Sequence, residues 1–493
     1  MPARIPLFLC TLLLGGCSLA PSYQRPAMPA LPSTLGSGTI RSDVDVVATA
    51  SRSTRTAAFT ALNIQESRLV NDFAPQRSAD QLATLTTLVE QALAHNAQYK
   101  LAMRRVDEAR ALMRMEGAAR LPSVAFQAES KRTRFDNADL NETEREHYSA
   151  AGLGMDFDLD FFGRLRSLSQ AAQERYVGSG YGLAATRAAL IAEVLRTHSI
   201  AVATADTWRV LRSNDGYQRQ LEAYARRQFE LGLISRDKLD AERNAAAAHH
   251  AATVNAEAQF AVAQRALNIL TGFVPSATLD TAGSVDVLAA MPLPIAALRD
   301  LDARILLDRP DIRQAEAELK ARHADIGAAR AAFFPSIHLS TGVGSVSESL
   351  DGLFKPGSRA WTFNPSVSLP IFDGGRNQAQ LDVAELRKDA GVAAYAQTIE
   401  AAFQEVAGAL DQQRALEAGE AAMRQREESL ERRTRALTRR VLQGLQDTTE
   451  LLDEHLRMEA ASLAHIDAAR DLALNRIRLL HAFYGTSFSL NQD

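Results

Sequence analysis

The chain contains two copies of one pattern, about 212 positions apart, and each copy sets a pair of strands between long helical stretches. The first strand pair falls within 121–164 and the second within 334–376. Two glycine pairs recur at nearly this interval, 212 positions for Gly232 with Gly444 and 213 for Gly272 with Gly485. One hairpin per copy supplies four strands, whereas a closed barrel needs about eight or more. The duplication therefore predicts an assembly that closes its sheet between subunits.

Residues 153–161 alternate between apolar and polar side chains, and residues 361–371 repeat the alternation. Successive side chains of a strand point to opposite faces, so each strand has one apolar and one polar face. This pattern is typical of outer-membrane barrel strands, whose apolar face meets lipid and whose polar face lines a watery lumen. The predicted lipid-facing residues are Met155, Phe157, Leu159, Trp361, Phe363, Val367 and Leu369, and the predicted lumen-facing acids are Asp156, Asp158 and Asp160.

A half-buried strand of a soluble sheet shows the same alternation, so these segments alone leave both interpretations open. The three aspartates also fit two roles. They suit the plain solvated face that a water-filled barrel needs, and they suit a surface that attracts cations.

Long helices dominate the rest of the sequence. A stretch without proline runs from Arg164 to about Gly232, and the second copy repeats it from Arg376 to about Gly444. A helix of nearly 70 residues is about 100 Å long, and its sparse apolar residues favour side-by-side packing as in a coiled coil. The first helical region, which starts near residue 82, is expected to break at His95 and Asn96 and to end before Pro122.

Charge and motifs exclude several classes of protein. The 55 basic and 59 acidic residues give a formal net charge of −4, which argues against a nucleic-acid-binding protein. The sequence has no HExxH, no P-loop, no GxSxG with partners and no dinucleotide fingerprint, so we do not expect an enzyme. We expect no metal site and no cofactor apart from a covalent lipid.

The N-terminus reads as a signal peptide over 1–16 that ends in a lipobox at Cys17. On this interpretation Cys17 carries N-acyl and S-diacylglycerol chains; the alternative is an ordinary signal peptide with an incidental cysteine. Residues 17–80 are then a lipidated, extended N-terminal segment. No later segment offers 18 consecutive apolar residues, so we expect β-strands to make any membrane crossing.

Several stretches together resemble one family, the TolC-like outer-membrane efflux proteins, in their lipidated multidrug-efflux branch. The stretches that carry the resemblance are 17–26, 92–96, 266–272, 309–316, 326–335 and 370–376.

The resemblance implies a mainly α fold with a small β part. Three chains would each give four transmembrane strands to a twelve-stranded barrel in the outer membrane, continued by a long periplasmic α-helical barrel with a mixed equatorial region. The expected domains are a first repeat over 81–280, a linker over 281–300, a second repeat over 301–487 and a C-terminal tail over 488–493.

The resemblance also implies a function and partners. The homotrimer would be the exit duct of a tripartite efflux system, working with a periplasmic membrane-fusion adaptor and a proton-driven inner-membrane pump. Its cargo would be drugs or other small toxic compounds, with metal ions or secreted proteins as alternatives. A lipid-anchored periplasmic coiled-coil scaffold is the competing structural interpretation, although it has no use for lipid-facing aromatic residues.

In this family the helix tips close the periplasmic end of the duct. The matching aperture residues are Glu450 and Asp453, with Asp447 either beside them or simply capping a helix in a capping box with Glu450. Ser235 is a predicted helix N-cap. The residues of the predicted adaptor-docking tip are Gly232, Ser235, Asp237 and Gly444.

Overall fold

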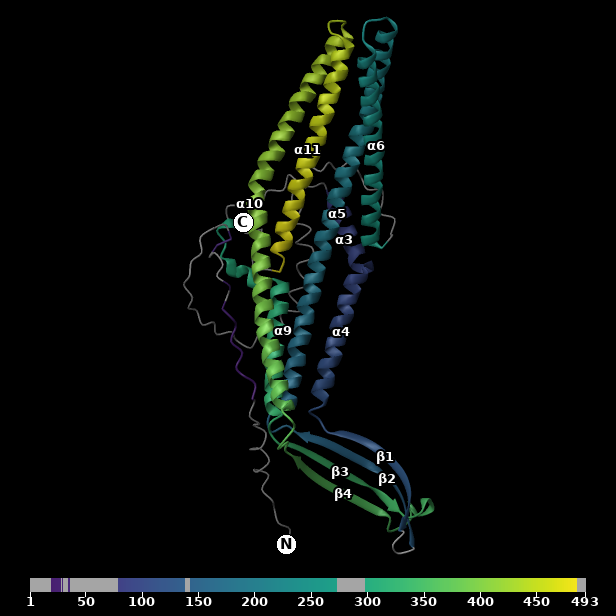
Figure 1. Cartoon of the computed structure of the whole chain (residues 1–493), viewed down its shortest axis with the longest axis vertical. Coiled ribbons are helices and arrows are strands. Elements are labelled where there is room, and N and C mark those ends of the chain that lie inside the picture. The colour runs from purple at the N-terminus through teal and green to yellow at the C-terminus, as the bar shows by residue number, and fades with distance from the viewer. Residues whose placement is uncertain are drawn as a thin grey trace. The chain divides into compact units, whose positions relative to one another are not determined.

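The computed structural model describes residues 19–27, 29, 34–35, 79–137, 142–272 and 298–485 (Figure 1). Cys17 and the predicted signal peptide lie outside these residues. The described part is mainly helical, with one small sheet. Its elements are α3 (Ala79–His95), α4 (Ala97–Ala118), β1 (Ser123–Asn137), β2 (Glu142–Leu159), α5 (Arg164–Glu230), α6 (Arg236–Thr271), η2 (Ala303–Asp308), α9 (Pro310–Ala331), β3 (Ser336–Ser347), η3 (Leu350–Gly352), β4 (Arg359–Ser368), α10 (Arg376–Leu442) and α11 (Thr448–Ala482).

The two copies contain matching helices of equal or nearly equal length. Helices α5 and α10 each have 67 residues, and α4 and α9 each have 22. The matched glycines share a left-handed backbone, with φ of 72° at Gly232, 70° at Gly444, 81° at Gly272 and 75° at Gly485. Such a conformation favours glycine just after the C-terminal end of a helix, so the matched residues Gly232 and Gly444 end α5 and α10 at the same length. The break after His95 is also present.

The chain divides into two compact units, and each unit takes segments from both repeats. One unit contains all four strands and the helical residues next to them, and the other contains the long helix pairs. Unit 1 comprises 1–27, 104–180 and 314–396, and unit 2 comprises 28–103, 181–313 and 397–493. Helices α5 and α10 each begin in unit 1 and end in unit 2.

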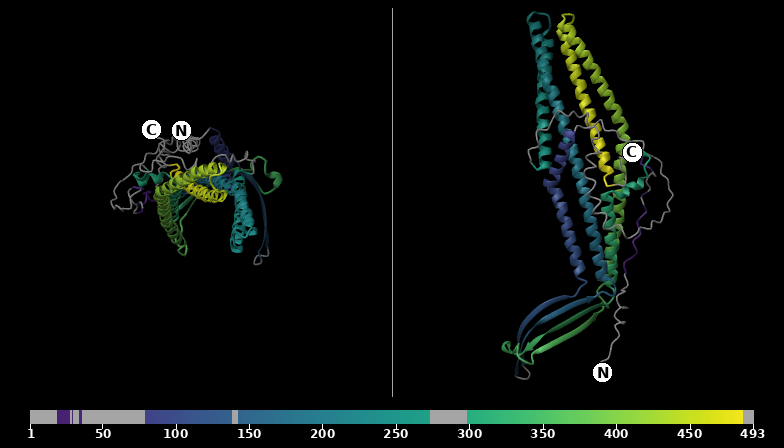
Figure 2. Two further views of the ribbon diagram at one scale, coloured as in Figure 1. Left: turned by 90° about the horizontal axis from the view of Figure 1, so that it is seen from above. Right: turned by 180° about the vertical axis from the view of Figure 1, so that it is seen from behind.

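In unit 1 the strands form one antiparallel sheet in the order β1-β2-β3-β4 (Figure 1; Figure 2, right). The central pairing joins the two repeats, because β2 of the first hairpin lies beside β3 of the second. Strands β1 and β2 extend well beyond the alternating residues 153–161 that predicted the first strand pair, into a predominantly polar stretch. Polarity was misleading there, since a strand with one solvated face alternates polar residues all along its length.

Two facing glycines let β2 and β3 approach closely. Gly152 pairs with Gly344. A Cβ atom added to Gly152 would lie 2.6 Å from the backbone oxygen of Val343, and one added to Gly344 would lie 2.3 Å from that of Ala151. Backbone atoms cannot swing aside, so this pair tolerates no larger side chain without a shift of the sheet.

Unit 2 has an apolar core where four helices meet. It is built from α3, α5, α6 and α11, and its most buried members are Leu85, Ala92, Val194, Leu267 and Ala473. Among the described residues, α5 contains an 18-residue stretch long and apolar enough by composition to cross a membrane, but 61% of that stretch is buried inside the chain. That burial is what a core helix shows, so the stretch is weak evidence for a membrane span.

A polar seam joins α10 to α11 beyond this core. Ser462 donates a hydrogen bond of 2.6 Å to Glu427, and the ring of His465 contacts Glu427 through Nδ1 and Glu420 through Nε2. The hydrogen bond with His465 is the main cause that holds the pKa of Glu427 below its usual value. Buried polar groups need such partners, so the seam favours one register of the two helices over their alternatives.

Candidate functional site

The strand register gathers the predicted lipid-facing residues on one face of the sheet. Met155 pairs with Val124 and Thr341, while Trp361 pairs with Val343, which in turn pairs with Leu153. Directly paired residues of antiparallel strands project to the same side. The apolar face therefore continues across all four strands, and it includes Val124, Phe126, Leu153, Met155, Phe157, Leu159, Ile337, Leu339, Val343, Trp361, Phe363 and Val367.

This apolar face is uncovered in the chain. Trp361 is 77% exposed, Phe126 70% and Val367 67%. A folded protein rarely leaves so many large apolar side chains side by side in water. The face therefore has the character of a surface that meets hydrocarbon.

The opposite face is polar. It includes Asp156 and Asp158, paired with Ser340 and His338 of β3. The His338 ring lies between the two acids, with Nδ1 at 2.8 Å from Asp158 and Nε2 at 3.3 Å from Asp156. Arg164 lies 3.6 Å from Asp158. Two cationic or potentially cationic groups thus accompany the acids, so this face is a mixed polar surface and not a purely acidic one.

Two predicted strand residues lie beyond the strands. Asp160 follows the end of β2, and its carboxylate accepts hydrogen bonds from the backbone N–H groups of Leu165 and Arg166 at 3.1 and 2.7 Å. It therefore caps the start of α5, where free N–H groups favour an acid. Leu369 follows the end of β4 and is 51% exposed. Alternation alone did not mark where either strand stops.

The two tight turns of unit 2 have the same construction. Helices α5 and α10, which lead into these turns, each end in a Schellman motif. The N–H of Leu233 donates to the carbonyl of Gln228, and the N–H of Leu445 donates to the carbonyl of Arg440, both at 2.9 Å. After the first turn Ser235 caps α6 by accepting from the N–H of Lys238, as predicted. Asp237 lies exposed in the first turn of α6.

Asp447 caps α11, because its carboxylate accepts from the N–H of Thr449 at 3.2 Å. The helix-capping interpretation of Asp447 is thus confirmed in this respect. Glu450 has a different partner from the one a capping box requires, since it accepts a hydrogen bond from the side chain of Gln446. Glu450 and Asp453 both lie exposed in the first turns of α11.

Lys238, next to the first turn, lies close enough to Asp453 for their charges to interact. The hydrogen bond from Lys238 to Glu242 is the main cause that raises the pKa of the ammonium group, and the charge of Asp453 raises it further. The salt bridge between Lys238 and Glu242 measures 2.7 Å. The first tip therefore places a cation near the acidic second tip within unit 2.

Leucines flank both turns and are exposed. Leu233 is 69% exposed and Leu445 70%, although the residue at this position of a Schellman motif usually packs against its own helix. Each tip therefore offers an exposed apolar side chain beside exposed polar residues, which suits contact with another protein.

Sequence reasoning missed two side chains of these surfaces. The sequence prediction for the second strand pair used only residues 361–371 and so missed His338, although period-two alternation through 336–344 would have placed it on the polar face. Glu454, next to the predicted aperture acids, is buried and forms ion pairs of 3.2 Å with Arg433 and 3.4 Å with Arg457. Only the fold could separate this buried acid from its exposed neighbour Asp453.

A family model for the outer membrane efflux proteins matches residues 88–273 and 303–483 of the chain. The two matched blocks coincide with the two structural repeats.

Similarity to individual proteins extends over nearly the whole chain. It is 32% identical to the outer membrane protein OprJ of Pseudomonas aeruginosa, with 98% of this chain and 95% of OprJ covered. It is also 32% identical to the cation efflux system protein CusC of Escherichia coli, with 98% and 99% covered. The toluene efflux pump outer membrane protein TtgI of Pseudomonas putida is 34% identical, with 82% of each chain covered.

Solved structures agree with this assignment. A membrane protein from Pseudomonas aeruginosa superposes with a TM-score of 0.76 at 31% identity, covering 95% of this chain and 100% of the other. CusC superposes with a TM-score of 0.75 at 29% identity, covering 95% and 99%. The chain therefore belongs to the outer membrane efflux protein family, and it is an outer-membrane efflux channel and not an enzyme.

Proposed function

We propose that three copies of this chain form the exit duct of a tripartite efflux system that carries small toxic organic compounds out of the cell. The observation that supports the proposal most is the four-stranded sheet, with one uncovered apolar face and one polar face. Each chain leaves β1 and β4 as sheet edges. Open edges are not tolerated in hydrocarbon, so neighbouring copies complete the barrel, and twelve strands in all enclose a watery lumen.

The partners and cargo form part of the proposal. We infer that the duct receives its cargo through a periplasmic adaptor from a proton-driven inner-membrane pump. Relatives of similar identity are named for cations in one case and for toluene in another, so the shared fold serves different cargoes. We propose that the cargo of this chain is organic compounds. Metal ions are the alternative, and a transport assay with each cargo distinguishes the two.

The exposed acids Glu450 and Asp453 supply the aperture. Around a threefold axis each becomes a ring of like charges at the narrow end of the duct, and such a ring attracts cations. The tips that carry Leu233 and Leu445, with Gly232, Ser235, Asp237 and Gly444, dock the adaptor. Cys17 carries the lipid that fastens the N-terminal segment to the membrane.

We expect the double substitution Glu450→Ala with Asp453→Ala to raise single-channel conductance in planar bilayers, because it removes both side chains from the constriction. Cells that carry it become more sensitive to large antibiotics. The isosteric pair Glu450→Gln with Asp453→Asn removes the charge alone and serves as the control for side-chain size. Unchanged conductance in the alanine variant would remove these residues from the aperture.

Replacing the tip leucines by Leu233→Asp and Leu445→Asp is expected to abolish capture of the adaptor by the purified channel. Each leucine that becomes buried contributes about 1.5–3 kcal/mol, and a carboxylate resists burial. Conductance of the isolated channel stays as in the wild type. Leu350→Asp, at an equally exposed leucine outside the tips, is the matched control; undiminished capture by the tip variant contradicts the docking assignment.

The substitution Cys17→Ala is expected to eliminate incorporation of radiolabelled palmitate and glycerol. The protein still fractionates with the outer membrane, because the sheet anchors it independently of the acyl chains. Palmitate labelling that persists in the variant shows that Cys17 is not the acylated residue.

A further inference from the structure

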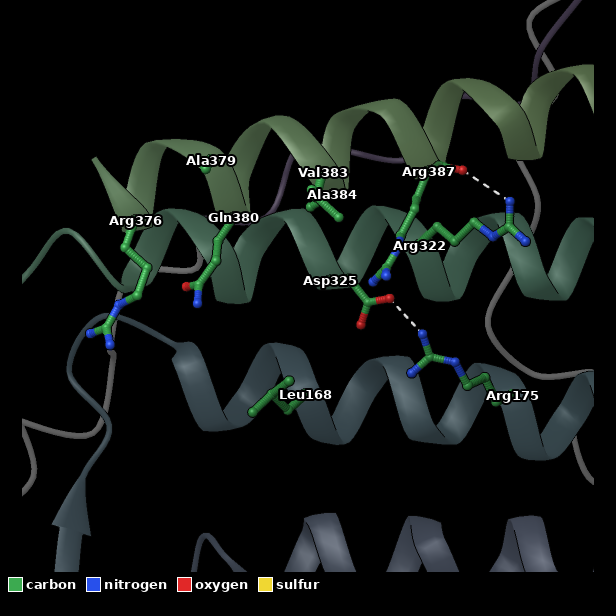
Figure 3. A pocket seen from close by; sticks show the side chains of 10 residues that line it. All are labelled: Leu168, Arg175, Arg322, Asp325, Arg376, Ala379, Gln380, Val383, Ala384 and Arg387. Carbon is green, nitrogen blue, oxygen red and sulfur yellow. Dashed lines mark hydrogen bonds and ion pairs between the residues drawn. The ribbon is translucent and has the colours of Figure 1, made fainter. Parts of the chain in front are cut away.

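Unit 1 contains an open pocket that the duct function leaves unexplained. It lies where α5, α9 and α10 run side by side and has a volume of about 540 Å³ (Figure 3). Its wall combines four arginines, one aspartate and a few apolar residues. The lining is Leu168, Arg175, Arg322, Asp325, Arg376, Ala379, Gln380, Val383, Ala384 and Arg387.

The positive charge of this pocket is only partly neutralised. Arg175 forms an ion pair of 2.5 Å with Asp325. Arg322 lies 3.3 Å from Glu318 and also donates to the backbone carbonyl of Arg387 at 2.9 Å. Within the part of the chain that the structure describes, Arg376 and Arg387 form no direct ion pair, although Asp373 lies close enough to Arg376 for their charges to interact, and both arginines are exposed. Two guanidinium groups thus remain available to a ligand.

The apolar part of the pocket lies between these charges. In Figure 3, Arg376, Gln380 and Arg387 reach from α10 toward α9, while Leu168 lies on α5 across the pocket. Val383 and Ala384 stand between the two free arginines along α10. Arginine binds carboxylates and phosphates through paired N–H donors, and the apolar residues suit a hydrocarbon or aromatic body. The site therefore fits an amphiphilic organic anion better than a small inorganic ion.

The two sides of α9 indicate where the pocket opens. One side is covered by the N-terminal segment: Arg25 bonds to Glu316 at 2.6 Å, Tyr23 contacts His323, and Ala20 lies against Gly327. These three helix positions recur along one stripe of a 3.6-residue helix. Arg322 and Asp325 lie on the opposite side of the same helix.

We propose that this pocket is a binding site for amphiphilic organic anions on the lumenal wall of the duct. The lumenal placement rests on the proposed function, because a segment that leads to a lipid anchor must run along the outside of the tube. The opposite side of α9 then faces the lumen, and three chains line it with three such pockets. A cationic, partly apolar binding site of this kind favours the passage of cargo that carries a carboxylate, sulfonate or phosphate group.

The site is tested with 6-carboxyfluorescein, a water-soluble aromatic anion, and the full-length protein in phosphatidylcholine nanodiscs. We expect fluorescence anisotropy to report saturable binding that weakens with salt and that falls about tenfold in Arg376→Gln with Arg387→Gln. The matched control, Arg414→Gln with Arg426→Gln, removes two exposed arginines of α10 outside the pocket and leaves binding unchanged. No saturable binding above that of empty nanodiscs, or equal affinity in wild type and pocket variant, overturns the site.

Two further readouts locate the site. In planar bilayers under a KCl gradient, the reversal potential is expected to show a lower ratio of anion to cation permeability in the pocket variant than in the control. Lost dye binding with an unchanged ratio overturns the lumenal placement, as does displacement of the dye by phosphatidylglycerol in the nanodisc, which would assign the pocket to lipid headgroups. Absence of any conductance contradicts the proposed duct and leaves the site intact, because dye binding needs no open channel.

Discussion

The unsatisfied backbone groups at the edges of one small sheet constrain everything else in this protein. Strands β1 and β4 are the edges, and the face between them is apolar and uncovered. In hydrocarbon, free N–H and C=O groups have no water to bond, so a four-stranded sheet is stable there only as part of a closed barrel. The chain therefore forms only part of a larger assembly, and its duplication supplies two equivalent hairpins.

The long helices follow the same duplicated plan as the hairpins. Glycines at matched positions end the long helices at equal lengths in both repeats, so the two turns are built alike at the tips. The side chains of those turns differ: Lys238 belongs to the first, whereas the acids Glu450 and Asp453 belong to the second. The two tips thus share a backbone conformation but carry different charges, so they can have different functions although both follow the same repeated pattern.

The features that could be predicted from the sequence are those that local periodicity encodes. The duplication, the break at His95, the N-caps at Ser235 and Asp447 and the apolar face around Met155 and Trp361 all follow from spacing within short segments. It missed what depends on partners far along the chain, such as the pairing of β2 with β3 that brings His338 to Asp158. The arginine pocket was invisible for the same reason, since its walls come from three separate helices. Asp160 was misplaced because a cap and a strand residue look alike until the helix start is known.

Quenching of Trp361 fluorescence by brominated phospholipids tests the central claim most directly. The chain has two tryptophans, Trp208 and Trp361, so Trp208→Phe leaves one probe on the apolar face of β4. We predict strong quenching of Trp361 in reconstituted protein. In the matched variant that carries Trp208→Phe and Trp361→Phe with Thr362→Trp, the probe moves to the polar face and we predict little quenching. Equal quenching at both positions, or none at Trp361, contradicts a sheet with lipid on one side and water on the other.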